Sequence, residues 1–224
     1  MISEPRTIAR ILELLHIPVQ HTPEQLRDVY MEVSRSCGYE NFIRTANGAR
    51  LETTGTEPGS FSRLTFAGDR MGFHEEHNNM SLENFLRRME EVVRVTTKLL
   101  SVPVFVARNV TLRALAGSPP GKHGSQFLAE NLFHLTAEEW GPFGRPGQIH
   151  GFRLQFPPTD PKGGIHQIRI ENYVRDPRSL FLEDWCTFKA PVQSQDLAQV
   201  NNELREVEDF LHERVYSFLN QYPR

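Results

Sequence analysis

Hydrophobic residues recur at helical spacing in the first part of the chain. We expect a first helix that starts at Ser3 and ends before His16, because Pro18 disfavours helical geometry at Ile17. A second helix has clearer boundaries: Thr22 and Gln25 have the spacing of a capping box, and Gly38 is a typical left-handed stop. The apolar positions of the two helices are Ile8, Ile11, Leu12 and Leu15, then Leu26, Val29, Tyr30 and Val33. Each set forms one helical face.

Two longer segments follow the same helical period. Residues 82–100 and about 195–220 place their apolar residues on one side, so that side of each helix must face a core or a partner. The first set is Leu82, Phe85, Leu86, Met89, Val92, Val93, Thr96, Leu99 and Leu100, and the second is Leu197, Val200, Leu204, Val207, Phe210, Leu211, Val215, Phe218 and Leu219. A shorter helix is expected in "QFLAENLFHL", residues 126–135.

Between these helices the hydrophobic period shortens to two residues, which is typical of β-strands. Strands are predicted in "ARLETT", "FSRLTF" and "DRMGFHEE", near residues 104–114, and in "FRLQFPP", "IHQIRIENYV" and "LFLEDWCTFKAPV". This order lacks the βαβ alternation and the glycine fingerprint of a doubly wound nucleotide-binding fold. We therefore predict an α+β protein, with a mostly antiparallel sheet packed on one face by long amphipathic helices.

The two halves of the chain share an order of elements. Residues 49–100 and 150–220 each contain strands followed by one long amphipathic helix. The residue identities do not match well enough to prove a duplication. We predict one α+β domain over residues 1–224, and an internal strand–strand–helix duplication with halves at about 1–115 and 116–224 is the alternative description.

Composition indicates an ordinary globular protein. Of 224 residues, 38% are hydrophobic and 24% are charged, and the net charge of −3 gives no electrostatic reason to expect nucleic acid. No apolar run approaches the roughly 20 residues of a membrane span, and the N-terminus lacks the pattern of a signal peptide. Cys37 and Cys186 have no CxxC spacing, so we expect free thiols in a reducing compartment, with one long-range disulfide as the alternative. We predict a soluble cytoplasmic protein with no membrane contact.

Two passages carry a resemblance to a known family. They are "RLTFAGDRMGFHEEHNNMSLENFLRRMEEVVRVTTKLLSVPVFVARNVTLRALA" and the tail "DLAQVNNELREVEDFLHERVYSFL", and together they cover about half of the chain. The sequence resembles an uncharacterised, sporadically distributed family of bacterial proteins of similar length. The resemblance implies a bacterial origin and this order of strands and helices, and it implies no activity.

The segment His74-Glu75-Glu76-His77 is the first candidate for chemistry. A helical zinc protease needs histidines at positions i and i+4, whereas these are at i and i+3 beside glycine and asparagine residues typical of a strand and a turn. On a strand, His74 and Glu76 share one face, and Glu75 and His77 share the other. The four groups therefore converge only if the chain bends sharply. We expect the polar end of a strand, with a metal-binding or catalytic site as the alternative.

Other histidines offer a second, composite site. His150 and His166 flank one predicted hairpin, and either could join His74 and His77 if the elements are neighbours in the sheet. His123 and His134 are further histidines of the middle region. We expect no metal and no cofactor, because nothing in the spacing requires this convergence.

The remaining motifs are weaker. "GSPPGKHGS" falls short of the Walker A pattern, because His123 stands where a serine or threonine would bind magnesium, so we interpret it as a surface loop. Strand alternation places Cys186 on the same face as Asp184. The carboxylates Glu171, Glu183 and Asp184 are expected to form salt bridges with Arg153 or Arg169 rather than a catalytic pair across strands.

Aromatic residues in a loop suggest binding rather than catalysis. Trp140, Phe143 and Arg145 lie in the Gly/Pro-rich segment "EEWGPFGRPG", and such residues either fold back onto the core or anchor a partner. We therefore predict a non-catalytic protein that binds something, with self-association or a protein partner expected and nucleic acid not expected. Two alternatives remain: a metal-dependent hydrolase that uses the histidine/glutamate segment, and a small-ligand-binding regulator with a cavity under the C-terminal helix.

Overall fold

A computed structural model describes residues 1–77, 79–133, 138–145 and 147–222. All strands belong to one antiparallel sheet with the order β2-β3-β4-β5-β1-β6-β9-β8-β7, and β10 pairs with β6 off this path. The strands are β1 (Arg6–His16), β2 (Asn41–Thr45), β3 (Gly48–Thr54), β4 (Phe61–Ala67), β5 (Arg70–Glu76), β6 (Val104–Gly117), β7 (Gly151–Phe156), β8 (Ile165–Asn172), β9 (Ser179–Phe188) and β10 (Val192–Gln193). The predicted α+β class with a large antiparallel sheet is confirmed.

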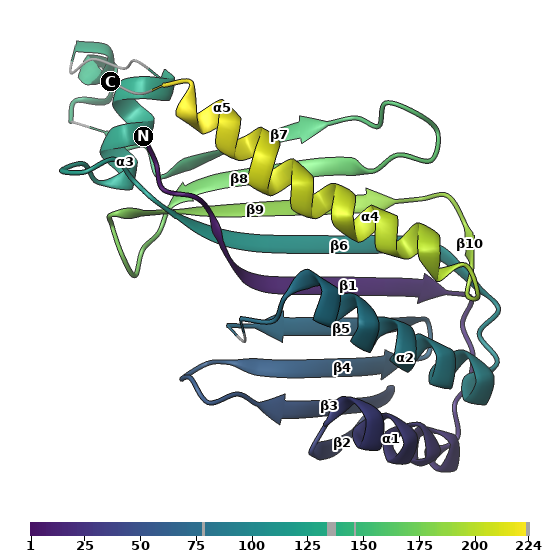
Figure 1. Ribbon diagram of the computed structural model, residues 1–224. Coiled ribbons are helices and arrows are strands. Elements are labelled where there is room, and N and C mark those ends of the chain that lie inside the picture. The colour runs from purple at the N-terminus through teal and green to yellow at the C-terminus, as the bar shows by residue number, and fades with distance from the viewer. Residues whose placement is uncertain (78, 134–137, 146, 223–224) are drawn as a thin grey trace.

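The long helices lie on one face of this sheet (Figure 1). They are α1 (Pro23–Cys37), α2 (Leu82–Leu100) and a C-terminal helix that consists of α4 (Leu197–Asp209), the π-helical segment η3 (Phe210–Val215) and α5 (Tyr216–Asn220). Shorter segments follow β6, namely α3 (Gly124–Phe127), the π-helical η1 (Leu128–Phe133) and the 3₁₀-helical η2 (Glu138–Phe143). Among the described residues, none of the helices is long and apolar enough to cross a membrane.

In each half of the chain, the first strand lies at the centre of the sheet and the later strands run from the outer edge back towards it. β1 and β6 form the central antiparallel pair, and Leu12 lies opposite Val110. On one side of this pair come β5, β4, β3 and β2, and on the other side come β9, β8 and β7. Each half therefore begins at the centre and returns to it from the outer edge before its long helix.

The predicted first helix is wrong, because residues Arg6–His16 form the central strand β1. The apolar steps that suggested a helix belong to two faces of a strand that pairs with β5 and β6. Leu12 and Leu14 are fully buried under the helices, whereas Ile11 and Leu15 lie half-buried on the opposite face. A central strand with apolar residues on both faces loses its period of two, and the pattern then imitates a helix.

The start and end of α1 match their sequence signals. The Thr22 side chain accepts a hydrogen bond from the backbone N–H of Gln25, the Gln25 side chain accepts one from the backbone N–H of Thr22, and Gly38 adopts a left-handed conformation with φ of 74°. The capping box at Thr22 is therefore confirmed.

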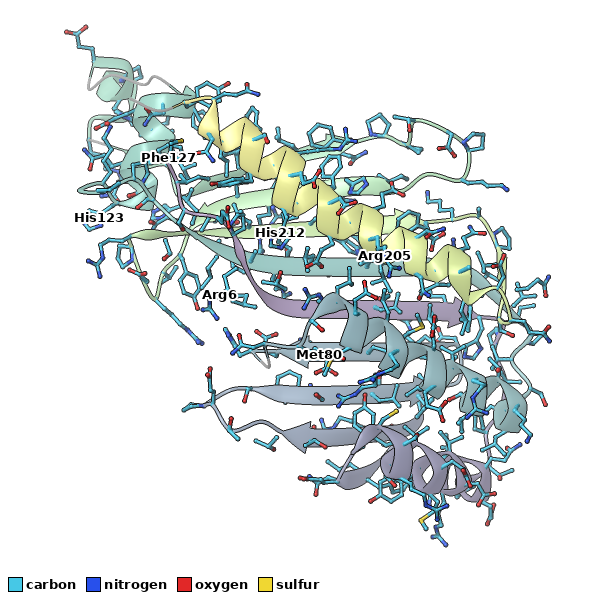
Figure 2. The ribbon with its side chains drawn as sticks, viewed as in Figure 1. Arg6, Met80, His123, Phe127, Arg205 and His212 are labelled. Atoms are coloured by element: carbon cyan, nitrogen blue, oxygen red, sulfur yellow. The ribbon has the colours of Figure 1, made fainter. Side chains whose placement is uncertain are left out.

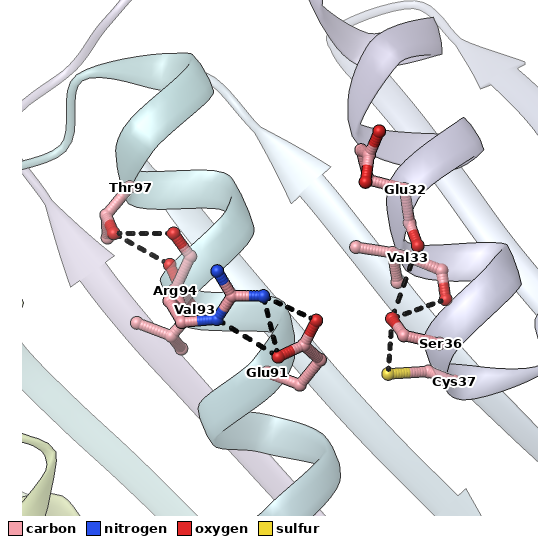
Figure 3. A network of polar contacts seen from close by, with 8 residues as sticks. All are labelled: Glu32, Val33, Ser36, Cys37, Glu91, Val93, Arg94 and Thr97. Atoms are coloured by element: carbon pink, nitrogen blue, oxygen red, sulfur yellow. Dashed lines mark hydrogen bonds and ion pairs between the residues drawn. The ribbon is translucent and has the colours of Figure 1, made fainter.

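Figure 3 shows the facing parts of α1 and α2, where Ser36 lies beside Cys37 and Arg94 pairs with Glu91 on α2 at 2.7 Å.

Both cysteines are buried free thiols, so the alternative of a long-range disulfide is wrong. Burial raises the pKa of the Cys37 thiol above its ordinary value. Burial also raises the pKa of the Cys186 thiol, and the charges of Asp184 and Glu206 raise it further. A thiol with a raised pKa is a poor nucleophile at neutral pH.

Candidate functional site

A pocket of about 1030 Å³ lies between the β7–β8 strands and the C-terminal helix. Ligand pockets in proteins are typically roughly 300–1,000 Å³ with mostly apolar walls, so this one is at the upper end of the range. Its apolar lining includes Leu154, Phe156, Ile168, Ile170, Val215 and Phe218. The pocket lies under the C-terminal helix, which is where one of the sequence-based alternatives places a ligand cavity.

The C-terminal helix is held against the centre of the sheet on the flank opposite the pocket. Arg108 of β6 is fully buried and forms two hydrogen bonds to Glu203, from Nε at 2.8 Å and from Nη2 at 2.5 Å. Arg10 of β1 pairs with Glu208 at 2.6 Å, one turn further along the helix. These contacts fix the helix over β1 and β6, and the outer strands β7 and β8 are left less covered.

His166 lines the pocket and forms a buried hydrogen-bonded pair with Asp184, which lies outside the lining. Nδ1 of His166 donates to Oδ2 of Asp184 at 2.7 Å, since a carboxylate can only accept. The side chains are 5% and 0% exposed, and Oδ1 of Asp184 has no hydrogen-bond partner in the part of the chain that the structure describes. A buried carboxylate with one unsatisfied oxygen concentrates negative charge behind the imidazole.

The pKa of His166 and the pKa of Asp184 are both higher than those of the free side chains. Burial by itself would lower the pKa of His166, but the hydrogen bonds and charges of Asp184 and Glu206 outweigh burial and raise that pKa above its ordinary value. Burial raises the pKa of Asp184, and the hydrogen bond from His166 opposes this rise only in part. The imidazole is therefore biased towards its charged, doubly donating form.

The other nitrogen of His166 faces the helix. Nε2 lies 3.4 Å from Oε1 of Glu206, and the imidazole stacks on the ring of Phe210 with centroids 4.0 Å apart. Phe156 of β7 packs edge-on against Phe210 at 5.3 Å. Phe210 is the first residue of the π-helical segment η3, and π-helical turns occur frequently at functional sites.

Charged side chains surround this end of the pocket. Arg205, labelled in Figure 2, donates from Nη2 to both carboxylate oxygens of Glu83 on α2, at 2.9 and 3.0 Å. Glu206 and Asp209 are exposed and line the pocket one turn apart. Asp209 has no ion pair or side-chain hydrogen bond within the described residues. The pocket thus combines apolar walls with a group of polar side chains at one end, and Arg214 is a further charged residue of its lining.

The segment 74–77 is bent at its end. His74 and Glu76 lie on the sheet face away from the helices, with Nε2 of His74 2.8 Å from Oε2 of Glu76. His77 has a positive φ of 49°, and its Nε2 comes within 3.4 Å of the same carboxylate. Glu75 instead points under the helices, where Arg88 pairs with it at 3.0 Å. Three of the four groups thus meet, and Glu75 has a separate, buried position.

The histidines of the composite site are spread over the sheet. His150 precedes β7 and His166 pairs with the last residue of that strand, so the two lie at opposite ends of the hairpin. His74 is on β5, which is separated from β8 by β1, β6 and β9, and it faces the other side of the sheet. No group of three His, Cys, Asp or Glu residues in the described ranges is arranged to hold a metal ion. His123 is exposed in its loop, and His134 lies outside the described residues.

The aromatic loop candidates lie away from the pocket lining. Trp140 is half-buried, and a side-chain carbon on Gly147 would touch its ring, so this ring packs on the backbone of its own loop. Phe143 is 71% exposed, and its ring lies 6.0 Å from that of Trp140. Arg145 is also exposed.

The salt bridges expected for Glu171 and Glu183 are present on the sheet face away from the helices. Nε of Arg169 lies 3.3 Å from Glu183 and 3.6 Å from Glu171, and Arg113 also pairs with Glu183 at 2.7 Å. The expected ion pairs of Glu171 and Glu183 with Arg169 are confirmed. The salt bridge expected between Asp184 and an arginine is wrong, because Asp184 pairs with His166 instead.

The sequence predicts His166 only as a candidate metal ligand and not as the partner of Asp184. A signal was nevertheless present. In "IHQIRI" the histidine falls in phase with Ile168 and Ile170, and in "LEDWCTF" the aspartate falls in phase with Leu182 and Cys186. Polar residues at buried positions of two consecutive strands are partners for one another when the strands are adjacent.

No protein-family model and no curated protein matches the chain.

Proposed function

We propose that this protein binds a small molecule with an apolar body in the pocket between β7–β8 and the C-terminal helix. The supporting observation is a pocket of about 1030 Å³ with mostly apolar walls, whose lining includes His166, the hydrogen-bond partner of the buried Asp184. An apolar enclosure with few, grouped polar side chains is the usual composition of a ligand site. The polar end orients the ligand, and the apolar walls supply most of the binding free energy.

We also propose that the two halves of the chain are a structural repeat, over about residues 6–100 and 104–220. The supporting observation is the matching order of strands outward from β1 and from β6. In the first half, α1 lies over the outer strands beside α2 (Figure 1). In the second half, α3 is held at the end of β8, where the backbone N–H of Ser125 donates to the Asn172 side chain at 3.2 Å. The pocket occupies the place that α1 fills in the first half.

Binding without catalysis is the simpler interpretation of this chemistry. His166 resembles a general base in its hydrogen bond to a buried aspartate, but a nucleophile must lie within reach of Nε2, and that atom faces Glu206. The nearby thiol of Cys186 packs in the core under Gly164, and burial raises its pKa. The pair therefore acts as a fixed polar contact for a ligand.

Fluorescence titration with the neutral apolar dye N-phenyl-1-naphthylamine tests the proposal. We expect saturable, one-to-one enhancement of dye emission with the unmodified protein. Val215→Trp places an indole in the pocket and should abolish the enhancement, as should Leu154→Trp on the strand side. Val174→Trp adds the same ring at a position that is 87% exposed in a turn, and serves as the control.

Thermal unfolding should show that each variant is folded before it is titrated. Two results would refute the proposal: no saturable binding by the unmodified protein, or equal binding by the folded pocket variants and the Val174→Trp control.

A further inference from the structure

We infer that the polar end of the ligand is an organic cation of the alkylammonium type, held by Glu206 and Asp209 beside the rings of Phe156 and Phe210. This inference rests on the proposed function, because it specifies which molecule suits the pocket. It depends on how charge and apolar surface are distributed along the pocket.

The pocket is polar at one end and apolar at the other. The C-terminal helix and β8 run side by side, so that Glu206 lies beside His166 near the start of the strand. Further along, Ile170 of β8 and Val215 and Phe218 of the helix line the apolar end. A ligand with one charged end and one hydrocarbon end matches this division.

The positive groups at the polar end are already engaged. Arg205 is bound by both oxygens of Glu83, and both ring nitrogens of His166 face carboxylates, Asp184 at 2.7 Å and Glu206 at 3.4 Å. An anionic ligand would have to displace one of these carboxylates and would meet the remaining ones. Arg214 also lines the pocket, but it lies eight positions after Glu206 along the chain and is exposed beside the apolar end.

At the polar end of the pocket, there are more carboxylates than positively charged side chains that pair with them. The charges of His166 and Asp184 cancel when the imidazole is protonated, and Arg205 is balanced by Glu83. Glu206 makes one long contact to His166, and Asp209 has no ion pair among the residues that the structure describes. A cation at the polar end of the pocket would therefore supply a positive charge beside Glu206 and Asp209.

The aromatic rings suit a cation as well as a hydrocarbon. Phe156 is 39% exposed, and its ring and that of Phe210 lie 5.3 Å apart at an angle of 64°. Electron-rich ring faces attract ammonium groups within about 6 Å, and aromatic residues together with carboxylates are the usual site for quaternary ammonium ligands. The two rings thus contact the first carbons and the charged nitrogen of the same ligand.

Competition with the bound dye distinguishes the head groups. Decyltrimethylammonium, decanol and decanoate share one alkyl chain, and each is titrated below its micelle-forming concentration against N-phenyl-1-naphthylamine. We expect the cation to displace the dye at about tenfold lower concentration than decanol, as cation–π and ion-pair contacts of this kind allow. Decanoate should be the weakest competitor.

Variants of the carboxylates assign the preference to the pocket. Glu206→Gln/Asp209→Asn should remove most of the advantage of the cation and leave the affinity for decanol nearly unchanged. Glu213→Gln, an exposed carboxylate of the same helix outside the pocket lining, should change neither value. Equal displacement by the cation and decanol, or stronger displacement by decanoate, would overturn the inference while leaving the proposed function intact. Failure of all three to displace a bound dye would count against both.

Discussion

Arg108 and Glu203 form a buried, two-point ion pair that joins the central strand β6 to the C-terminal helix. The arginine side chain is 0% exposed and the glutamate 6%, and the backbone oxygen of Ala190 accepts a further hydrogen bond from the same guanidinium. The two residues are 95 positions apart in the sequence. The pair fixes the position of the helix, and therefore the width of the pocket on its other flank.

Removing one partner of this pair should destabilise the fold strongly. Glu203→Gln leaves the Arg108 charge buried without a counter-charge, and such changes typically cost about 3–5 kcal/mol of unfolding free energy. Urea denaturation measures the loss. Glu83→Gln, which removes the partner of Arg205 at the surface, should cost less than about 1 kcal/mol. A loss for Glu203→Gln no larger than that of this control would contradict the anchoring role of the pair.

The His166 pair predicts a pH dependence of stability with a definite sign. The pKa of His166 is higher in the folded protein than its ordinary value of 6.5, so its contribution to the unfolding free energy is fully present below pH 6.5. That contribution is lost as pH rises through the folded pKa. Urea denaturation from about pH 6 to about pH 9 should show stability falling with pH, and the fall should be shallower in His166→Gln. An unchanged slope in this variant would contradict the assignment.

His212 provides a comparison of opposite sign. Burial lowers the pKa of this histidine, whose Nε2 lies 2.8 Å from Oγ1 of Thr7. A lowered pKa makes the folded state bind the proton less strongly, so this contribution is present above pH 6.5 and is lost as pH falls through the folded pKa. His212→Gln should therefore flatten the acid side of the stability profile and leave the alkaline side unchanged.

A side chain at Gly164, which lines the pocket, should destabilise the folded protein. A Cβ atom there would lie 2.2 Å from Sγ of Cys186 and 2.8 Å from the ring of Phe188, both of which are fully buried. Gly164→Ala should cost about 1–3 kcal/mol of unfolding free energy through overpacking. Gly141→Ala, at a position with open space, is the matched control, and equal thermal unfolding of the two variants would refute the prediction.

Local signals in the sequence were sufficient for much of the fold. The capping box at Thr22 and the left-handed Gly38 depend on neighbouring residues, and the structure has both. The alternation in residues 61–76 predicted two strands for the same reason. The central strand β1 was misassigned because its burial on both faces is decided by β5 and β6, which lie far away in the sequence.

The pocket depends on long-range contacts that spacing along the chain does not reveal. His166 and Asp184 were each visible as polar residues among buried ones, but their meeting requires the β8–β9 register. The anchoring of the helix by Arg108 and Glu203 requires the topology of the whole sheet. The segment around His74 stands out by its composition, whereas the pocket side chains stand singly in apolar strands and in an amphipathic helix.

The most direct test of the central claim locates the bound ligand on the protein. Methyl-resolved NMR during titration with decyltrimethylammonium should shift the signals of Ile168, Ile170 and Val215, which line the pocket. The signals of Ile11 and Leu115, on the sheet face away from the helices, should not move. Saturable shifts confined to the pocket methyl groups are the predicted result. Shifts confined to the opposite face of the sheet, or no shifts at saturating ligand, would contradict the account.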